Sequence, residues 1–108
     1  MVLVKYDEES DGFYASVSDK KAFLTIELSH RIGVDVSQDK HVVGVEILDA
    51  SKVLSDLFGR VIPRARIKHV LCSISEKDEI YVKFELGKDR VSMAIPRLYK
   101  SPLLQVHC

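Results

Sequence analysis

Residues 42–58 read VVGVEILDASKVLSDLF, and the spacing of the apolar residues changes in the middle of this stretch. Val43, Val45 and Ile47 alternate with a glycine and a charged residue, a pattern typical of a strand with one buried face. After residue 49 the apolar residues recur three and four positions apart, as on one face of a helix: Ala50, Val53, Leu54, Leu57 and Phe58. The stretch therefore predicts a strand that leads directly into a short amphipathic helix.

Both ends of this helix carry residues that favour a helix terminus. Asp49 or Ser51 can cap the exposed amide groups at its start, and Gly59 supplies the permissive backbone that ends it. Pro63 follows and prevents a restart of the helix. A helix of about ten residues is marginal by itself, so we expect its apolar stripe to pack on a sheet.

Alternation of apolar and polar residues predicts strands on both sides of this stretch. These strands lie at residues 13–17, 24–28, 32–36, 70–74, 80–86 and 91–95. The segments between neighbouring strands are short, polar and turn-forming, so the strands should be antiparallel neighbours in a meander. We therefore predict an α+β domain, a β-rich antiparallel meander of about seven short strands with one short helix packed on the sheet.

The chain has 108 residues, of which 46% are hydrophobic and 30% charged, an ordinary composition for a globular domain. This length suits a single domain over residues 1–108, with strands and the helix in residues 1–58 and further strands and a tail in residues 59–108. No apolar run approaches the roughly 20 residues of a membrane span, and two cysteines cannot form a disulfide framework. We therefore expect a soluble, cytoplasmic protein.

Charge is distributed unevenly between the two halves of the chain. Residues 1–58 hold 6 Lys or Arg and 11 Asp or Glu, a balance of −5, whereas residues 59–108 hold 10 and 5, a balance of +5. Such asymmetry can mark an acidic or a basic interaction surface. The simpler interpretation is that the halves face each other, within one monomer or across a dimer, and neutralise each other.

Several short motifs resemble those of a known family. The sequence VKYD at positions 4–7 is followed by DGFY at 11–14, and VDV at 34–36 leads to VVGVEILDAS at 42–51. These motifs are similar to those of domain of unknown function 2283 (DUF2283), whose members are small prokaryotic proteins with a Tyr-Asp start and a Gly-Ile-Glu-Ile-Leu-Asp-Ala-Ser close. The family's hairpin before this close usually carries a glycine, where this chain has Lys40.

The resemblance covers the first half of the chain, and the second half resembles the longer archaeal members only loosely. What the resemblance implies is a fold rather than a reaction. Some bacterial relatives look like partners of small toxin-like proteins, which implies an interaction module.

The closing motif has a structural interpretation at each position. Gly44 allows an aromatic ring or a neighbouring chain to approach the strand closely, because it has no side chain. Glu46 faces away from the core, and Leu48 joins the contact between strand and helix. Asp49 and Ser51 form the corner at which the strand becomes a helix. A structural role therefore accounts for the whole motif.

The residues with reactive side chains form no recognisable catalytic or metal-binding pattern. Cys72 lies in an alternating apolar strand, where a small buried side chain is expected. Asp35 and Asp39 lie four positions apart around a turn, and residues 7–11 form an acidic turn, but neither stretch has the ligand spacing of a calcium loop. We therefore predict a protein that is not an enzyme, with no catalytic residues, no cofactor and no metal.

One basic run follows the helix. Its residues are Arg60, Arg64, Arg66 and Lys68, and the last three alternate, so an extended chain would project them from one face. That geometry could hold the phosphate backbone of a nucleic acid or another anion. No aromatic residue is interleaved with these charges, and a contact with the acidic first half also explains them.

These observations favour a non-enzymatic protein-interaction or assembly domain that forms a homodimer. A meander of short strands leaves at least two edges, and an open edge pairs with another strand unless it is protected. The apolar tail at residues 101–106 can lie on its own domain or on a neighbour. The partner is then a second copy or another small protein, rather than a nucleic acid or a membrane. The alternative is a small anion- or nucleic-acid-binding protein that uses Arg64, Arg66 and Lys68.

Overall fold

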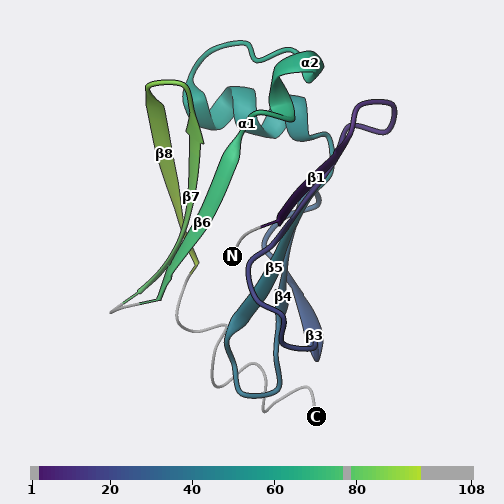
Figure 1. Cartoon of the computed structure of the whole chain (residues 1–108), viewed down its shortest axis with the longest axis vertical. Coiled ribbons are helices and arrows are strands. Elements are labelled where there is room, and N and C mark those ends of the chain that lie inside the picture. The colour runs from purple at the N-terminus through teal and green to yellow at the C-terminus, as the bar shows by residue number, and fades with distance from the viewer. Residues whose placement is uncertain (1–2, 77–78, 96–108) are drawn as a thin grey trace.

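The computed structural model describes residues 3–76 and 79–95, which form two antiparallel sheets and two helices (Figure 1). The larger sheet contains five strands in the order β1-β2-β5-β4-β3. The bounds of its strands are Leu3–Asp7 (β1), Gly12–Ser16 (β2), Leu24–Glu27 (β3), Ile32–Val36 (β4) and Val42–Ile47 (β5). Neighbouring strands in this sheet all run antiparallel.

The smaller sheet contains three strands in chain order, which are Leu71–Glu76 (β6), Ile80–Leu86 (β7) and Asp89–Ile95 (β8). The helices α1 (Ala50–Phe58) and α2 (Arg64–Ile67) connect the two sheets and close one end of the space between them (Figure 1). Neither described helix is long and apolar enough to cross a membrane. The predicted strand-rich α+β class is confirmed, although the eight described strands form two sheets.

The strand order departs from a simple meander at one place. β2 pairs with β5 instead of β3, whereas β3, β4 and β5 follow one another, as do the strands of the smaller sheet. The register pairs Phe13 with Ile47 and Ala15 with Val45, and these four side chains are buried. A strand with fully buried apolar side chains removes more apolar surface from water at the centre of a sheet than at its edge. β3, whose side chains are half-buried or exposed, forms an edge.

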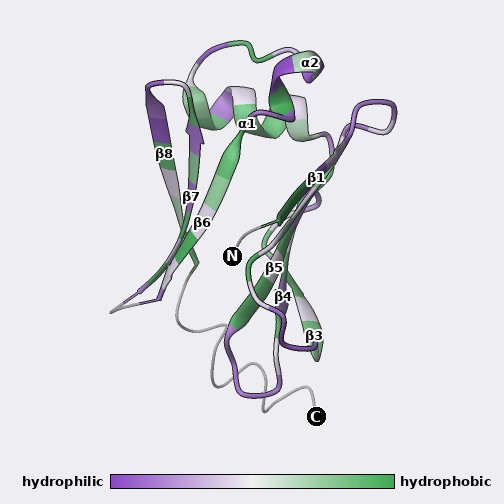
Figure 2. Ribbon diagram, viewed as in Figure 1, coloured by the Kyte–Doolittle hydropathy of each residue, from purple (hydrophilic) through white to green (hydrophobic). Residues whose placement is uncertain are grey.

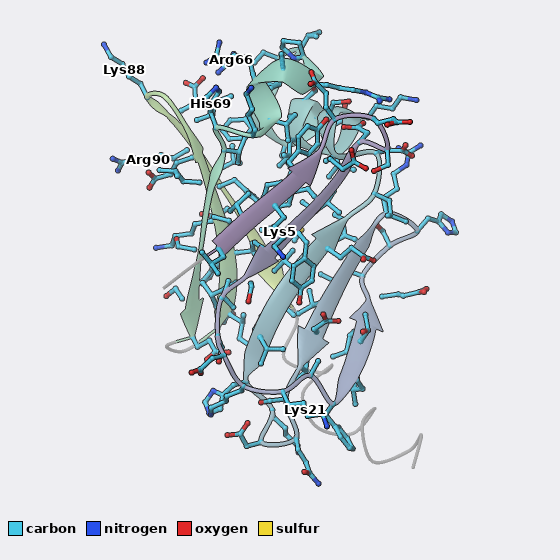
Figure 3. The ribbon with its side chains drawn as sticks, turned by 45° about the vertical axis from the view of Figure 1, so that its right-hand side comes forward. Lys5, Lys21, Arg66, His69, Lys88 and Arg90 are labelled. Atoms are coloured by element: carbon cyan, nitrogen blue, oxygen red, sulfur yellow. The ribbon has the colours of Figure 1, made fainter. Side chains whose placement is uncertain are left out.

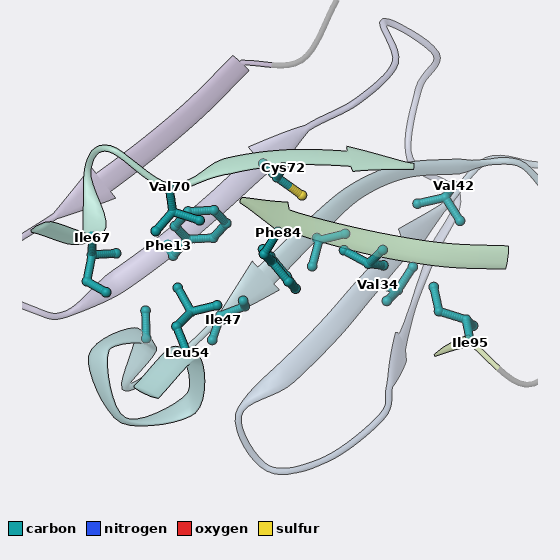
Figure 4. Close-up of a cluster of buried hydrophobic side chains, with 14 of the residues drawn as sticks. Phe13, Val34, Val42, Ile47, Leu54, Ile67, Val70, Cys72, Phe84 and Ile95 are labelled. Atoms are coloured by element: carbon teal, nitrogen blue, oxygen red, sulfur yellow. The ribbon is translucent and has the colours of Figure 1, made fainter. Parts of the chain in front are cut away.

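The core lies between the two sheets and draws on both halves of the chain (Figure 4). Phe13 of β2 meets Phe84 of β7 edge to face, with ring centroids 6.2 Å apart, a favourable geometry for an aromatic pair. One end of the core is closed by Leu54 of α1, by Ile62 before α2 and by Ile67 of α2, and these side chains are at most 2% exposed. Figure 2 shows hydrophobic residues on α1 and along β5 and β6, which help to enclose this core.

α1 ends as its sequence predicts. Gly59 adopts a left-handed conformation with φ of 72°, and its amide donates to the carbonyl of Asp56. The amide of Arg60 donates to the carbonyl of Ser55. Together these bonds form the Schellman motif, in which a glycine helps to satisfy carbonyl groups that the helix leaves open. Leu54 is fully buried, so the predicted apolar stripe faces the core.

The segment after Pro63 is helical, which corrects the expectation of an extended chain. Pro63 is the N-cap of α2, a single turn from Arg64 to Ile67. A proline is compatible with a helix start because the amide proton that it lacks is not needed there. The buried side chain of Ile67 holds this turn against the core. Arg66 and Lys68 therefore do not form an alternating row with Arg64.

Two residues that flank β5 bear on the expectations from the sequence. Lys40 has a left-handed backbone with φ of 70°, a conformation that favours glycine, so the glycine usual in the family's hairpin has a conformational basis. Leu48 is 49% exposed, so the expected packing of this residue between strand and helix is wrong. It follows Glu46 by two positions and therefore shares the outward face of the strand.

Candidate functional site

A buried carboxylate joins the turn between β1 and β2 to the start of α1. Asp11 is 1% exposed and accepts hydrogen bonds from the Tyr6 hydroxyl at 2.6 Å, the Ser51 hydroxyl at 2.7 Å and the Ser51 amide at 3.0 Å. The Ala50 amide donates to the backbone carbonyl of Asp11 at 2.9 Å. Asp11 therefore caps α1 although it lies 40 positions before Ser51 in the chain.

This arrangement corrects the predicted helix cap. Asp49 occupies the N-cap position, but its φ is 51° and its carboxylate makes no capping hydrogen bond. The Asp49 carboxylate pairs instead with Arg31 at 3.1 Å. Ser51 donates to Asp11 and does not act as a cap itself. The corner contains the predicted residues, but an acid from another turn satisfies the helix start.

The charge of Asp11 is stabilised from several sides. Burial by itself opposes ionisation, but three hydrogen bonds and the charge of Arg64 outweigh it and hold the pKa of Asp11 below its ordinary value. Burial and the hydrogen bond to Asp11 raise the pKa of Tyr6. Arg64 lies 3.8 Å from the carboxylate and also donates to the backbone carbonyls of residues 8 and 9. Arg64 thereby ties α2 to the acidic turn.

The outer face of the larger sheet carries a second hydrogen-bonded group. A Cβ atom on Gly44 would lie 2.0 Å from the Tyr14 hydroxyl oxygen, so the predicted close approach of an aromatic ring is confirmed. The Tyr14 hydroxyl donates to Asp35 at 2.9 Å, and the Thr25 hydroxyl donates to the other oxygen of that carboxylate at 2.5 Å. Burial and the bond to Asp35 raise the pKa of Tyr14 to about 12. Glu46 is exposed, as predicted.

A third polar group joins the two sheets at the end opposite the helices. The Glu76 carboxylate accepts a hydrogen bond from the Val42 amide at 3.0 Å and lies 3.1 Å from the His41 imidazole. Nearby, Asp39 pairs with Lys20 at 2.7 Å, and the hydrogen bonds from Lys20 and Ser37 lower the pKa of Asp39 to about 2. The Glu76 contact connects the end of β6 to the start of β5, so it holds one sheet to the other.

Several side chains with reactive chemistry bond to neighbouring groups or are buried. Asp35 and Asp39, which lie around one turn, each bond to neighbouring side chains. In residues 3–76 and 79–95, no three His, Cys, Asp or Glu side chains are placed to hold a metal ion. The predicted burial of Cys72 is confirmed, and burial raises the pKa of its thiol to about 11, which makes the thiol a poor nucleophile at neutral pH.

The structure divides the basic run after α1. Arg60 pairs with Asp89 of β8 at 2.8 Å, and Arg64 faces the acidic turn. Arg66 and Lys68 are exposed, on α2 and directly after it. The expected common face of Arg64, Arg66 and Lys68 depended on an extended chain, and the helical turn places Arg66 on another side than Arg64.

Other basic side chains lie near Arg66 instead (Figure 3). His69 follows α2, and Lys88 and Arg90 belong to the hairpin between β7 and β8, which lies at the same end of the molecule. Arg90 also lies 3.7 Å from Glu85 on the facing strand. Sequence spacing could not reveal this group, because a turn sequence predicts a hairpin without indicating which helix lies beside it.

Polar side-chain contacts between the two halves of the chain occur at both ends of the described structure. Arg64 meets Asp11 at the helix end, and His41 meets Glu76 at the opposite end. Other pairs lie within one half: Lys20–Asp39, Arg31–Asp49, Arg60–Asp89 and Arg90–Glu85. Among the described residues, the expected neutralisation of one half by the other is therefore local.

The polar groups above fall largely within a segment shared with a known family. Residues 3–51 match the family described as Protein of unknown function (DUF2283), so the resemblance is confirmed for the N-terminal part of the chain. No curated protein and no solved structure matches the chain. The matched segment runs from β1 to Ser51, so it includes both partners of the Asp11 cap and the contact of Tyr14 with Gly44.

Proposed function

We propose that this protein is a non-enzymatic interaction domain that assembles as a homodimer through the edge formed by β6. The observation that carries the proposal is the composition of that edge. Residues 71–75 read LCSIS and contain no charged residue, the charge of β6 is limited to Glu76 at its end, and Leu71 is 64% exposed. Within the described sheets β6 has one neighbouring strand, β7. An edge of this kind presents unpaired backbone groups to another strand.

The other edges of the described sheets carry charged side chains, which usually protect an edge. β1 contains Lys5 and Asp7, and β3 is only 4 residues long and contains Glu27. β8 begins with Asp89 and Arg90. Charge and short length both oppose pairing with a further strand. β6 is therefore the edge best suited to dimerisation.

A second copy fits this edge by symmetry. Two β6 strands related by a two-fold axis would pair antiparallel and join the two smaller sheets into one continuous sheet. Ser73 lies near the middle of β6 and is exposed, so its small side chain leaves room for the partner strand. Leu71 would lose water-exposed apolar surface in the same contact, which favours association.

The non-enzymatic part of the proposal is supported by what the buried polar groups do. Asp11 caps a helix, and Ser37 bonds to main-chain groups of His41 in the turn before β5. Cys72 is a free thiol. Free thiols are the usual state of cysteine in a reducing compartment, and we therefore also propose a cytoplasmic location.

The dimer can be tested with lysine substitutions at two serines that flank Lys83 in one row of the smaller sheet. Ser73 lies on β6 and Ser92 on β8, and both are exposed. Ser73→Lys would bring like charges together across the two-fold axis and should convert the dimer into a monomer. Ser92→Lys introduces the same repulsion from Lys83 and should leave the dimer intact.

Sedimentation velocity over a range of protein concentrations measures both outcomes. A wild-type protein that stays monomeric at high micromolar concentration would contradict the proposal. Equal weakening by the two substitutions would exclude β6 as the interface. The tail at residues 101–106, which the sequence suggested as a further contact, lies outside the described residues.

A further inference from the structure

Exposed basic side chains gather at the end of the molecule formed by α2 and the hairpin between β7 and β8, which we call the basic end. Its residues are Arg66, Lys68, His69, Lys88 and Arg90. Figure 3 shows Arg66 and His69 beside α2 and Lys88 and Arg90 on the neighbouring hairpin. Two separate segments of the chain therefore contribute positive charge to one surface.

The two acidic residues of the hairpin between β7 and β8 already have cationic partners, whereas the acidic turn at residues 7–11 lies beside Arg64 of α2. Asp89 in the hairpin bonds to Arg60 at 2.8 and 2.9 Å, and Glu85 lies 3.7 Å from Arg90. The cations of the basic end that have no carboxylate oxygen within 4.0 Å among the described residues are Arg66, Lys68 and Lys88. Their charges are available to a ligand from outside.

The layout of these charges favours a ligand with several anionic groups. The five side chains are exposed and are distributed over a helix and a hairpin. A small anion is bound best by groups that converge on one point in a cleft. A nucleic acid instead presents a row of phosphates, each of which a separate Lys or Arg can neutralise. The basic end therefore matches a polyanion.

The surroundings of the basic end distinguish between kinds of polyanion. The exposed large hydrophobic residues of the described chain are Leu3, Phe23, Leu48, Val61, Leu71 and Tyr81. Leu71 borders the basic end, since it follows His69 by two positions and pairs with Glu85, but positions 64–69 and 85–90 themselves contain none of these residues. Protein interfaces depend on apolar or aromatic anchors, and single-stranded nucleic acids depend on aromatic stacking. Contacts to the phosphates of a duplex need neither.

We propose that the basic end binds the phosphate backbone of double-stranded nucleic acid without sequence preference. β6 pairs with β7 only as far as Glu85, so the tip of the hairpin beyond that residue is a two-stranded ribbon, which can reach into the major groove with Lys88. Arg66 and Lys68 then face the flanking phosphates. The chain as a whole is neutral, so this binding depends on the cations of the basic end and not on the net charge.

Fluorescence anisotropy with a labelled DNA duplex tests this proposal at two salt concentrations. If about four phosphates are neutralised, raising the salt from about 50 mM to about 200 mM should weaken binding roughly 100-fold. Arg66→Gln combined with Lys88→Gln removes two of these contacts, so the same change of salt should weaken binding by this variant only about tenfold. Both side chains are exposed, so circular dichroism should show an unchanged fold.

Lys5→Gln combined with Lys21→Gln is the matched control. Both lysines are exposed, lie away from the basic end in Figure 3 and change the net charge by the same amount when substituted. This control variant should bind the duplex as tightly as the wild type. The proposal is overturned if the wild type does not bind the duplex at low salt, or if both double variants lose affinity equally.

Two other polyanions complete the experiment. Vesicles that contain phosphatidylserine represent an anionic membrane, and a poly-glutamate peptide represents an acidic protein. Tighter binding to either than to the duplex, at the same salt, would overturn the proposal. The Arg66 and Lys88 substitutions lie outside β6, so sedimentation of this variant should show wild-type self-association. The nucleic-acid proposal and the homodimer proposal can therefore fail separately.

Discussion

Each of the two ends of the molecule has a carboxylate that accepts a hydrogen bond from a main-chain amide, but the two carboxylates differ in burial. At the helix end, Asp11 is 1% exposed and caps α1 through Ser51. At the opposite end, the side chain of Glu76 is 27% exposed, and its partners include the amide of Val42 and the half-exposed ring of His41. A hydrogen bond to a charge is stronger away from water, so the helix end should contribute more to stability.

The two carboxylates also differ in their position relative to the segment that matches the family. Both partners of the Asp11 contact lie in the segment that matches the family, whereas Glu76 lies outside it. A carboxylate contact with a main-chain amide therefore lies within the family segment at the helix end and involves the smaller sheet, outside that segment, at the opposite end.

The largest effect should come from breaking the helix end at its apolar contact. Leu54→Asp places a charge in a fully buried position, at a cost of several kcal/mol, and should unfold the protein. Lys52→Asp introduces the same side chain on the exposed side of α1 and should leave the fold intact. Circular dichroism during heating measures both. A Leu54→Asp protein that melts cooperatively within a few degrees of the wild type would show that the helix end matters little.

The next effect should come from the buried carboxylate itself. Asp11→Asn removes the charge that three donors share and turns an amide group toward them, so the free energy of unfolding at neutral pH should fall by about 3 kcal/mol. Urea denaturation gives this value. A loss below about 1 kcal/mol, which is typical of an exposed pair, would remove the distinction between the two ends.

The pH dependence of the Asp11 contribution has a definite sign. Because folding lowers the pKa of Asp11, its contribution is complete above the pKa of the unfolded chain, about 4, and is lost as the pH falls through the folded value. The difference in stability between the wild type and Asp11→Asn should therefore shrink below about pH 4. Urea denaturation at a series of pH values tests this, and a difference that stays constant with pH would contradict it.

The opposite end should respond more weakly. Glu76→Gln keeps a carbonyl for the Val42 amide and removes the charge beside His41, so the loss of stability should stay below about 1 kcal/mol. Added salt should reduce the difference further, because the pair is partly exposed. Denaturation at low and high salt measures it. A loss equal to that of Asp11→Asn would mean that burial does not distinguish the two ends.

The smallest effect should be a gain of stability in the turn before β5. Lys40 has a φ of 70°, which costs a non-glycine residue about 1 kcal/mol. Glycine removes this strain but also gives the unfolded chain more conformational freedom, which offsets part of the gain. Lys40→Gly should therefore stabilise the protein by a few tenths of 1 kcal/mol. Lys21→Gly, at a residue without a positive φ, should be slightly destabilising instead. Denaturation midpoints of the two variants compare them, and an equal loss in both would contradict the prediction.

The class of fold could be predicted because local spacing determines it. The change of period after Ile47 marks where β5 gives way to α1, and Gly59 marks where the helix ends. The pairing of β2 with β5 could not be predicted, because several alternating segments present equivalent apolar faces. Only the three-dimensional arrangement shows that the Phe13 row meets the Ile47 row.

The polar contacts were predictable only where both partners were neighbours or one had no side chain. Gly44 indicated that another group approaches the strand closely, because it has no side chain, and the ring of Tyr14 is that group. The cap by Asp11 was not predictable, because a closer candidate, Asp49, stood at the helix start. The pairing within the basic run was not predictable for the same reason, because the acidic partner of Arg60 is Asp89 on a distant strand.

The edge-to-face contact of Phe13 with Phe84 crosses the boundary of the family match, because the first residue lies inside the matched segment and the second outside it. Interiors are close-packed, so a change of volume on one side has to be compensated on the other. Core substitutions in the two parts of the chain should therefore be coupled in their effects on stability. The second half sets which core substitutions the family segment tolerates in this protein, and a segment grafted from a relative would need an added sheet reshaped to receive it.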